Sequence, residues 1–213
     1  MKLAVVAAAL LTGSATAAVD LRPAVLRPAQ VGKGYQLVAR NDGFGVKAAP
    51  TLDLCGQPKS YPSESLRVDR LQVDYLKKQE PIGLSNEVVR YKPGGAVQAM
   101  REVRRHARAC PPRPVDTGLS GVGPLRFTIT VLRDAKLAKD SIAVRVRAVG
   151  KLSSGKRVDQ TSYAVYQRVG DVLSGVYSFG PNTATQQRFA LHAAEASARL
   201  LHKLRPAPQG PPA

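Results

Sequence analysis

The sequence predicts an α+β protein with a single twisted antiparallel β-sheet, two long helices packed on it and one disulfide. Apolar and polar residues alternate along six segments, as they do in strands that turn one face to a core. The links between most of these segments have only hairpin length, which requires antiparallel pairing. Two further segments carry apolar residues at three- and four-residue steps and stand apart from the main run of strands. This order is typical of the α+β class.

The predicted strands fall into two groups along the chain. They cover residues 65–75, 86–91, 125–131, 141–149, 158–169 and 172–179. In the first strand the alternation slips by one residue between Val68 and Leu71, which indicates a β-bulge. The section before it contains only a short extended piece at residues 35–38, a turn at residues 41–43 and modest apolar content. We therefore expect this N-terminal section to lie across the domain rather than to supply a core strand.

Both predicted helices are amphipathic. The first lies between Pro93 and Pro112, with Gly94 and Gly95 at its start and a proline pair at its end. Its apolar stripe consists of Ala96, Met100, Val103, Ala107 and Cys110. The second runs from about residue 183 to residue 204, and its stripe consists of Phe189, Ala193, Ala196, Leu200 and Leu204.

The N-terminus has the pattern of a secretory signal peptide, which we assign to residues 1–17. Lys2 precedes an apolar run over residues 3–11, and the small-residue triplet Ala15-Thr16-Ala17 follows. That run is too short to span a bilayer, which takes about 20 residues. We expect a secreted protein without a transmembrane segment, a domain over residues 25–204 and a disordered Pro-rich tail over residues 205–213.

The chain is strongly basic. Its formal net charge is +17, from 32 Lys and Arg against 15 Asp and Glu. Such a charge favours anionic partners, although arginine can equally serve only to keep the protein soluble. The basic residues are spread along the chain without a block of five or six, and aromatic residues make up 5% with no Trp. We therefore expect no nucleic-acid partner.

The two cysteines predict the disulfide. In an exported chain Cys55 and Cys110 are expected to pair, and closing a loop of this length is worth roughly 4 kcal/mol in the chain-entropy model. Two free buried thiols are the alternative. The cysteines and the histidines His106, His192 and His202 show no recurrent ligand spacing, so we expect neither a metal nor a cofactor.

The sequence contains no recognisable catalytic constellation. No G-x-S-x-G motif occurs, and Gly121-Val122-Gly123-Pro124 precedes a strand rather than opening a helix. The first helix offers a candidate anion-binding face, formed by Arg101, Arg104, Arg105 and Arg108. The alternative is that this face is simply solvated, with Glu102 as company.

Several stretches, in this order, resemble a known family. They are Leu54-Cys55-Gly56, Ser85–Tyr91, Pro93–Ala96 with a helix ending at Cys110-Pro111, Ser162–Tyr166, Asp171–Tyr177 and the Ala-rich final helix. Together they are similar to the extracellular sensor domain of PknH-type Ser/Thr kinases and to stand-alone secreted sensor-domain proteins of actinobacteria. The resemblance implies a twisted antiparallel sheet flanked by helices, with a cleft for an extracellular ligand and no catalysis. The chain departs from the kinases in lacking a kinase domain and in having only two cysteines.

These observations lead to three functional hypotheses. The first is a secreted, non-enzymatic sensor-like domain that binds a small molecule or a cell-envelope component in a cleft. The second is a basic cell-surface protein that adheres to anionic wall polymers or lipids. The third is a hydrolase whose site the sequence does not reveal.

Overall fold

The computed structural model describes residues 20–42, 54–55, 61–77, 82–118, 120–133, 137, 139–180 and 184–204. Within these residues, seven strands form one antiparallel sheet in the order β1-β2-β3-β7-β6-β5-β4. The strands are β1 (Tyr35–Asp42), β2 (Arg67–Lys77), β3 (Gly83–Tyr91), β4 (Arg126–Leu132), β5 (Ser141–Lys151), β6 (Arg157–Val169) and β7 (Val172–Gly180). The predicted signal peptide, Pro-rich tail and turn at 41–43 lie wholly or partly outside the described residues.

Three α-helices and two short 3-10 helices complete the described part of the chain. They are α1 (Pro28–Val31), α2 (Gly95–His106), α3 (Ala184–Lys203), η1 (Arg22–Ala24) and η2 (Pro62–Leu66). The α+β class, the single sheet and the two long helices are confirmed.

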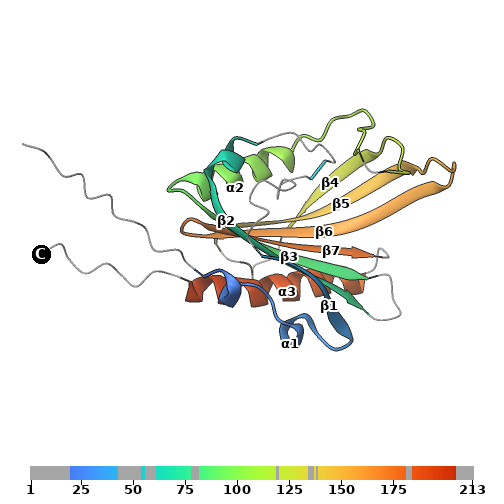
Figure 1. The fold of residues 1–213 in the computed structure, drawn as a ribbon. Helices are drawn as coiled ribbons and strands as arrows, with labels where there is room; N and C mark the ends of the chain where they lie inside the picture. The colour runs from blue at the N-terminus through green and yellow to red at the C-terminus, as the bar shows by residue number, and fades with distance from the viewer. Residues whose placement is uncertain are drawn as a thin grey trace, which may run out of the picture.

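The sheet consists of two meanders that meet at its centre (Figure 1). β1, β2 and β3 form one meander, and β4 to β7 form the other. The central pair is β3 with β7, which are far apart in the sequence and antiparallel in the sheet. α2 follows β3 and leads to the far edge, where β4 begins, whereas α3 follows β7.

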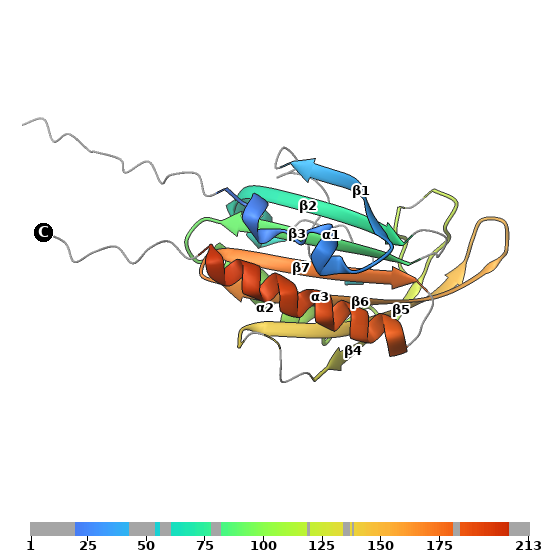
Figure 2. The same cartoon turned by 90° about the horizontal axis from the view of Figure 1, so that it is seen from below.

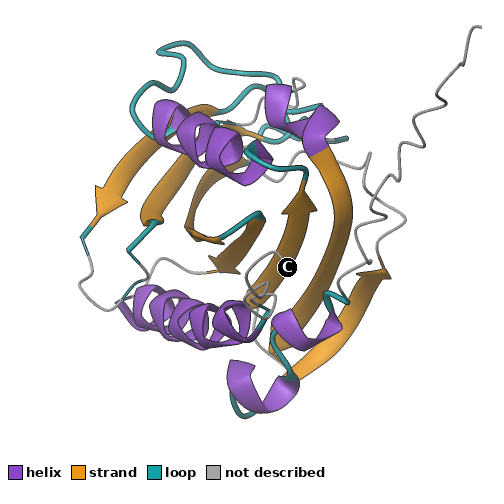
Figure 3. Cartoon of the chain, turned by 90° about the vertical axis from the view of Figure 1, so that its left-hand side faces the viewer, coloured by secondary structure: helices purple, strands orange, loops and turns teal. Residues whose placement is uncertain are grey.

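The two long helices cover opposite faces of the sheet, as Figures 1 and 3 show. Each face has its own hydrophobic core. The α2 core includes Val89, Ala96, Met100, Val103, Val144, Tyr166 and Leu173. The α3 core includes Leu26, Val73, Val88, Val165, Val176, Ala193 and Leu201. Because successive side chains of a strand point to opposite faces, neighbours such as Val88 and Val89 serve different cores.

The N-terminal section contributes more than the sequence indicated. It lies across the α3 side, as expected, where Leu21, Val25 and Leu26 are buried in the α3 core. It also supplies β1, an eight-residue strand that pairs with β2 at the edge of the sheet (Figure 2). The sequence pattern hid this strand because an edge position leaves residues such as Leu37 and Val38 about half exposed, at 48% and 54%.

The predicted bulge in β2 is confirmed. Arg67 pairs with Tyr91 and Asp69 pairs with Arg90, so Val68 is the extra residue between the two pairs. A bulge shifts the alternation by one residue. This shift leaves Val68 exposed and directs Leu71, Val73 and Tyr75 into the α3 core.

The predicted α2 helix is present, but it ends at His106 rather than at Cys110. Two tighter turns follow, in which Arg108 N–H donates to the Arg105 carbonyl and Ala109 N–H to the His106 carbonyl. Pro111 disfavours a helical conformation at Cys110, because a residue before proline avoids that conformation. Four members of the predicted stripe, Ala96, Met100, Val103 and Ala107, are buried, whereas Cys110 is only half-buried.

Candidate functional site

A cavity of about 370 Å³ lies on the α2 face of the sheet and continues the α2 core. Strands β4 to β7 supply its floor, and the segment after α2 and the residue before Cys55 supply other parts of its wall. The lining residues are Leu54, Thr117, Leu125, Phe127, Val146, Ala148, Gln160, Ser162, Tyr163, Ala164, Tyr166, Tyr177, Ser178 and Phe179. Most of these are apolar or aromatic, and a few carry hydroxyl or amide groups.

Small side chains on two paired strands create this hollow. Val146 of β5 lies opposite Ser162 of β6, and Ala164 follows on the same face of β6. With only a hydroxymethyl or a methyl group at these two β6 positions, the strand leaves space where α2 no longer covers the sheet. The cavity therefore results from the small size of two side chains in a strand whose alternating pattern is otherwise ordinary.

The segment between α2 and β4 is held close to the sheet beside this hollow. Val115 and Leu125 form a bridge within the segment, and Val122 forms another with Leu152. At Gly150 a Cβ atom would lie 2.5 Å from a Leu125 methyl carbon, so only glycine permits this approach.

The predicted disulfide is present and borders the cavity. Cys55 and Cys110 are bonded, with their Cα atoms 5.6 Å apart. Cys55 and its neighbour Leu54 are both buried, and Leu54 lines the cavity. Since Cys110 follows α2, the disulfide ties this wall residue to the end of the helix.

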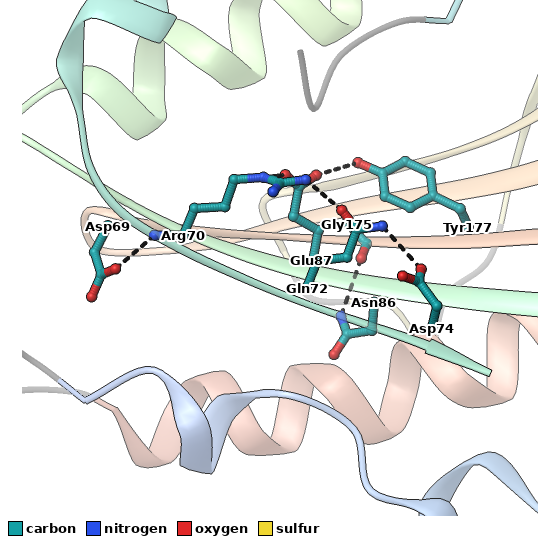
Figure 4. A network of polar contacts seen from close by, with 8 residues as sticks. All are labelled: Asp69, Arg70, Gln72, Asp74, Asn86, Glu87, Gly175 and Tyr177. Atoms are coloured by element: carbon teal, nitrogen blue, oxygen red, sulfur yellow. Dashed lines mark hydrogen bonds and ion pairs between the residues drawn. The ribbon is translucent and has the colours of Figure 1, made fainter. Parts of the chain in front are cut away.

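A buried ion pair contacts Tyr177, one of the aromatic residues that line the cavity; Figure 4 shows this contact. Tyr166 and Tyr177 pack edge to face with ring centroids 5.6 Å apart. The Tyr177 hydroxyl donates to Glu87 Oε2 at 3.2 Å, and Glu87 Oε1 accepts from Arg70 Nε. The Arg70 and Glu87 side chains are only 6% and 3% exposed.

Burial raises the pKa of the Tyr177 phenol well above its ordinary value, and the nearby Tyr166 and Glu87 act in the same direction. The phenol is therefore a neutral hydrogen-bond donor at physiological pH. Its position depends on Gly175, where a Cβ atom would lie 2.3 Å from the Tyr177 hydroxyl oxygen.

From the ion pair a line of polar side chains runs along β2 towards its C-terminal end. Arg70 Nη2 donates to Gln72 Oε1, Gln72 Nε2 donates to Asp74 Oδ1 at 2.9 Å, and the Ser85 hydroxyl donates to the same Asp74 oxygen. Arg70 Nη1 is buried without an acceptor among the described residues. The arrangement orients Glu87 and, through it, Tyr177.

The four arginines of the predicted anion-binding face do not line this cavity in the described part of the structure. Arg101, Arg105 and Arg108 are exposed on or just after α2, whereas Arg104 is half-buried. Arg104 Nη2 lies 2.5 Å from Asp140, whose other oxygen contacts Arg168 Nε. Anion binding by the exposed arginines stays a prediction.

The carboxylate of Asp140 is held between two guanidinium groups. Partial burial by itself would raise its pKa, but the hydrogen bonds from Arg104 and Arg168 outweigh that effect and the pKa is lowered. Asp140 therefore remains ionised and links α2 to β6. Glu102, expected on the solvated face, is instead buried, where Ser63 N–H and hydroxyl groups and the Gln98 amide donate to it.

The histidines take different positions. His106 packs edge to face on Tyr61 with centroids 4.9 Å apart, and its Nδ1 lies 3.4 Å from the Tyr61 hydroxyl. His192 and His202 are exposed on α3. Within the described residues, no three His, Cys, Asp or Glu side chains are grouped to hold a metal ion. The helices found there are all too short or too polar to cross a bilayer.

Sequence reasoning missed the residues that build the cavity. The small residues Ser162 and Ala164 looked like ordinary positions of an alternating strand. Glu87 gave the only available signal, because a carboxylate beside Val88 and Val89 in a strand buried on both faces requires a partner.

Comparison with known proteins places the fold. No family profile matches the chain, and no curated protein matches it. The crystal structure of the extracellular domain of PknH from Mycobacterium tuberculosis aligns with 83% of this chain and 93% of that domain, with a TM-score of 0.56 and 12% identity. An uncharacterized protein of Mycobacterium smegmatis aligns with 85% of this chain and 97% of its own, with a TM-score of 0.42 and 11% identity. The resemblance to a PknH-type extracellular domain is thus confirmed at the level of the fold.

Proposed function

We propose that this protein is an exported, non-enzymatic sensor-like domain whose ligand site is the cavity on the α2 face of the sheet. The observation that carries the proposal is the cavity itself, about 370 Å³ with mostly apolar walls and a few convergent polar groups. Ligand sites for small molecules have this size and this composition. The fold shared with the extracellular domain of PknH supports a role outside the cytoplasm.

The lining defines the kind of ligand that we propose. Leu125, Phe127 and Val146 offer apolar contacts, while Tyr166 and Tyr177 offer aromatic faces. Hydroxyl groups such as that of Ser162 can fix orientation. None of the described lining residues carries a full charge, so the ligand that we propose is a largely apolar small molecule or envelope component with one or two hydrogen-bonding groups.

A thermal-shift screen against cell-wall fragments, lipids and metabolites tests this proposal, because a ligand that binds only the folded state raises Tm. The decisive variant is Ser162→Phe, which fills the hollow from its floor. We expect the shift produced by a largely apolar hit to disappear in this variant. The control is Ser154→Phe, the same change at an exposed position in the turn between β5 and β6.

Two results contradict the cavity as the site. One is a largely apolar hit that stabilises Ser162→Phe as much as the unmodified protein. The other is a folded protein that no member of such a screen stabilises.

Export is a separate part of the proposal and has its own measurement. Expression with residues 1–17 intact is expected to release a mature protein cut after Ala17 or Ala18. Mass spectrometry of the extracytoplasmic fraction reads the new N-terminus directly. Retention of Met1 or Lys2 in that fraction contradicts a cleaved signal peptide.

A further inference from the structure

The sheet carries a second hollow, on the face opposite the cavity. Val144 and Val146 of β5 point to the α2 side, so the alternating residues Arg145 and Arg147 point to the α3 side. α3 contacts mainly β6 and β7, and the β5–β6 hairpin extends past it (Figure 2). This leaves an open groove of about 550 Å³, lined by Thr128, Thr130, Arg145, Arg147, Asp159 and Thr161.

The two arginines of the groove differ in what they bind. Arg147 forms a two-pronged ion pair with Asp159, with Nε to Oδ1 at 2.8 Å and Nη2 to Oδ2 at 2.7 Å. Its charge is therefore already matched by a carboxylate, which also lies 3.5 Å from Arg157. Among the described residues that line this groove, Asp159 is the only acidic one.

Arg145 has no such partner. Among the described residues, its hydrogen-bond neighbour is the Thr130 hydroxyl, 3.4 Å from Nη2, and no carboxylate lies within ion-pair distance. The side chain is exposed and stands directly opposite Thr130 in the strand register. Arg145 thus offers an unmatched guanidinium beside a hydroxyl group.

We infer that this groove binds a phosphate ester, with Arg145 as the charged group and the Thr128 and Thr130 hydroxyls as flanking donors. The two threonines lie two residues apart on β4, about 7 Å along the strand. A phosphate can accept from a guanidinium and still present oxygens to neighbouring hydroxyls. A carboxylate bound to Arg145 as Asp159 is bound to Arg147 would have both oxygens on the guanidinium, whereas a phosphate has further oxygens for the threonines.

The size and charge of the molecule agree with this assignment. A groove of about 550 Å³ has room for the group esterified to the phosphate as well as for the phosphate itself. The net charge of +17 attracts anions to the whole surface, and the groove gives that attraction a defined place. The site is independent of the cavity, because alternate residues of the same strands form the two walls.

Inorganic phosphate is the probe, titrated at constant ionic strength while backbone amide shifts are followed by NMR. We expect saturable shifts at Thr128, Thr130 and Arg145, and at least a tenfold weaker Kd in Arg145→Gln. The matched control is Arg199→Gln, which removes the same charge from an exposed position on α3 and should leave the Kd unchanged. Both sites are exposed, so both variants should fold, and their melting curves verify this.

Three outcomes overturn the inference. Non-saturating shifts spread over all exposed arginines show general charge attraction only. An unchanged Kd in Arg145→Gln removes the site from the groove. A parallel titration with acetate that saturates the same amides more tightly than phosphate assigns the groove to carboxylates. The Ser162→Phe variant should keep its phosphate response, which separates this site from the ligand cavity.

Discussion

The Arg70–Glu87 pair holds Tyr177, one of the aromatic residues of the cavity, in its orientation. Both side chains are buried, and Glu87 also accepts the hydrogen bond that orients the Tyr177 hydroxyl. Bringing two charges out of water is costly, so such a pair adds little net stability compared with apolar residues of similar size. Replacing only one of the two residues is strongly destabilising, because the other charge then stays buried without a partner.

Glu87→Gln is therefore expected to lower the free energy of unfolding by about 3–5 kcal/mol, since it leaves the Arg70 guanidinium without a counter-charge. The double variant Arg70→Met, Glu87→Gln should regain most of the loss. Urea unfolding of the two single variants and the double variant gives the coupling energy. Asp159→Asn, which breaks the exposed pair with Arg147, serves as control and should leave the midpoint unchanged. Independent, additive effects at the two buried positions would contradict the pairing.

The burial of Tyr91 predicts how the stability of the protein changes at alkaline pH. Burial is the main cause that raises the pKa of Tyr91 to about 12, although Arg67 acts against it. The unfolded chain loses this proton near pH 10, so the stabilisation is complete below pH 10 and is lost as pH rises towards 12. Two pKa units correspond to about 3 kcal/mol. Urea unfolding between pH 8 and pH 11.5 should show a shallower decline in Tyr91→Phe, and identical slopes would show that Tyr91 is accessible.

At the scale of elements, the sequence predicted what depends on local alternation. The β2 bulge at Val68 and the strands from β4 to β7 follow from patterns within a few residues. The sequence did not predict β1, because an edge strand needs no continuous apolar face. Nor did it predict the choice of opposite faces for α2 and α3, because that choice depends on the pairing of β3 with β7 across more than 80 residues.

The candidate site was even less accessible to sequence reasoning. Its cavity depends on Ser162 and Ala164 meeting the segment that contains Leu125, and no local pattern shows where that segment folds. The sequence identifies the arginine face because it shows which residues are charged, whereas a cavity depends on how distant residues pack. Only the disulfide wall was predictable, from the count of cysteines.

The disulfide gives the prediction at this scale. Cys110→Ser should cost about 2–5 kcal/mol, because it removes the bond that ties Cys55 to the residue after α2. The change is compared by thermal and urea unfolding with Arg101→Gln and Arg105→Gln, which alter only exposed charges on the same helix and should have little effect. A larger loss of stability in the arginine variants than in Cys110→Ser would show that the exposed arginines, rather than the disulfide, stabilise this helix.

At the scale of the whole molecule, the described residues form two hydrophobic cores, one on each face of a single sheet. Strands β3, β6 and β7 are buried on both faces, so each core rests on the same backbone hydrogen bonds. The α2 core carries the cavity and the disulfide, and the α3 core carries the N-terminal section. Damage to either core must therefore reach the central strands that both cores share.

This shared sheet predicts one cooperative unfolding transition. Met100→Ala in the α2 core and Leu201→Ala in the α3 core remove fully buried side chains, and each should cost about 2–5 kcal/mol. In each variant, native-state hydrogen exchange should show protection falling by one common factor at all the slowly exchanging amides of β3 and β7. The reason is that these strands open only with global unfolding. The exposed change Val131→Ala on β4 serves as control and should leave protection unchanged. If Leu201→Ala exposed the α3 side while β3 and β7 kept their protection, the two cores would be separate folding units, and the sheet would hold them together without coupling them.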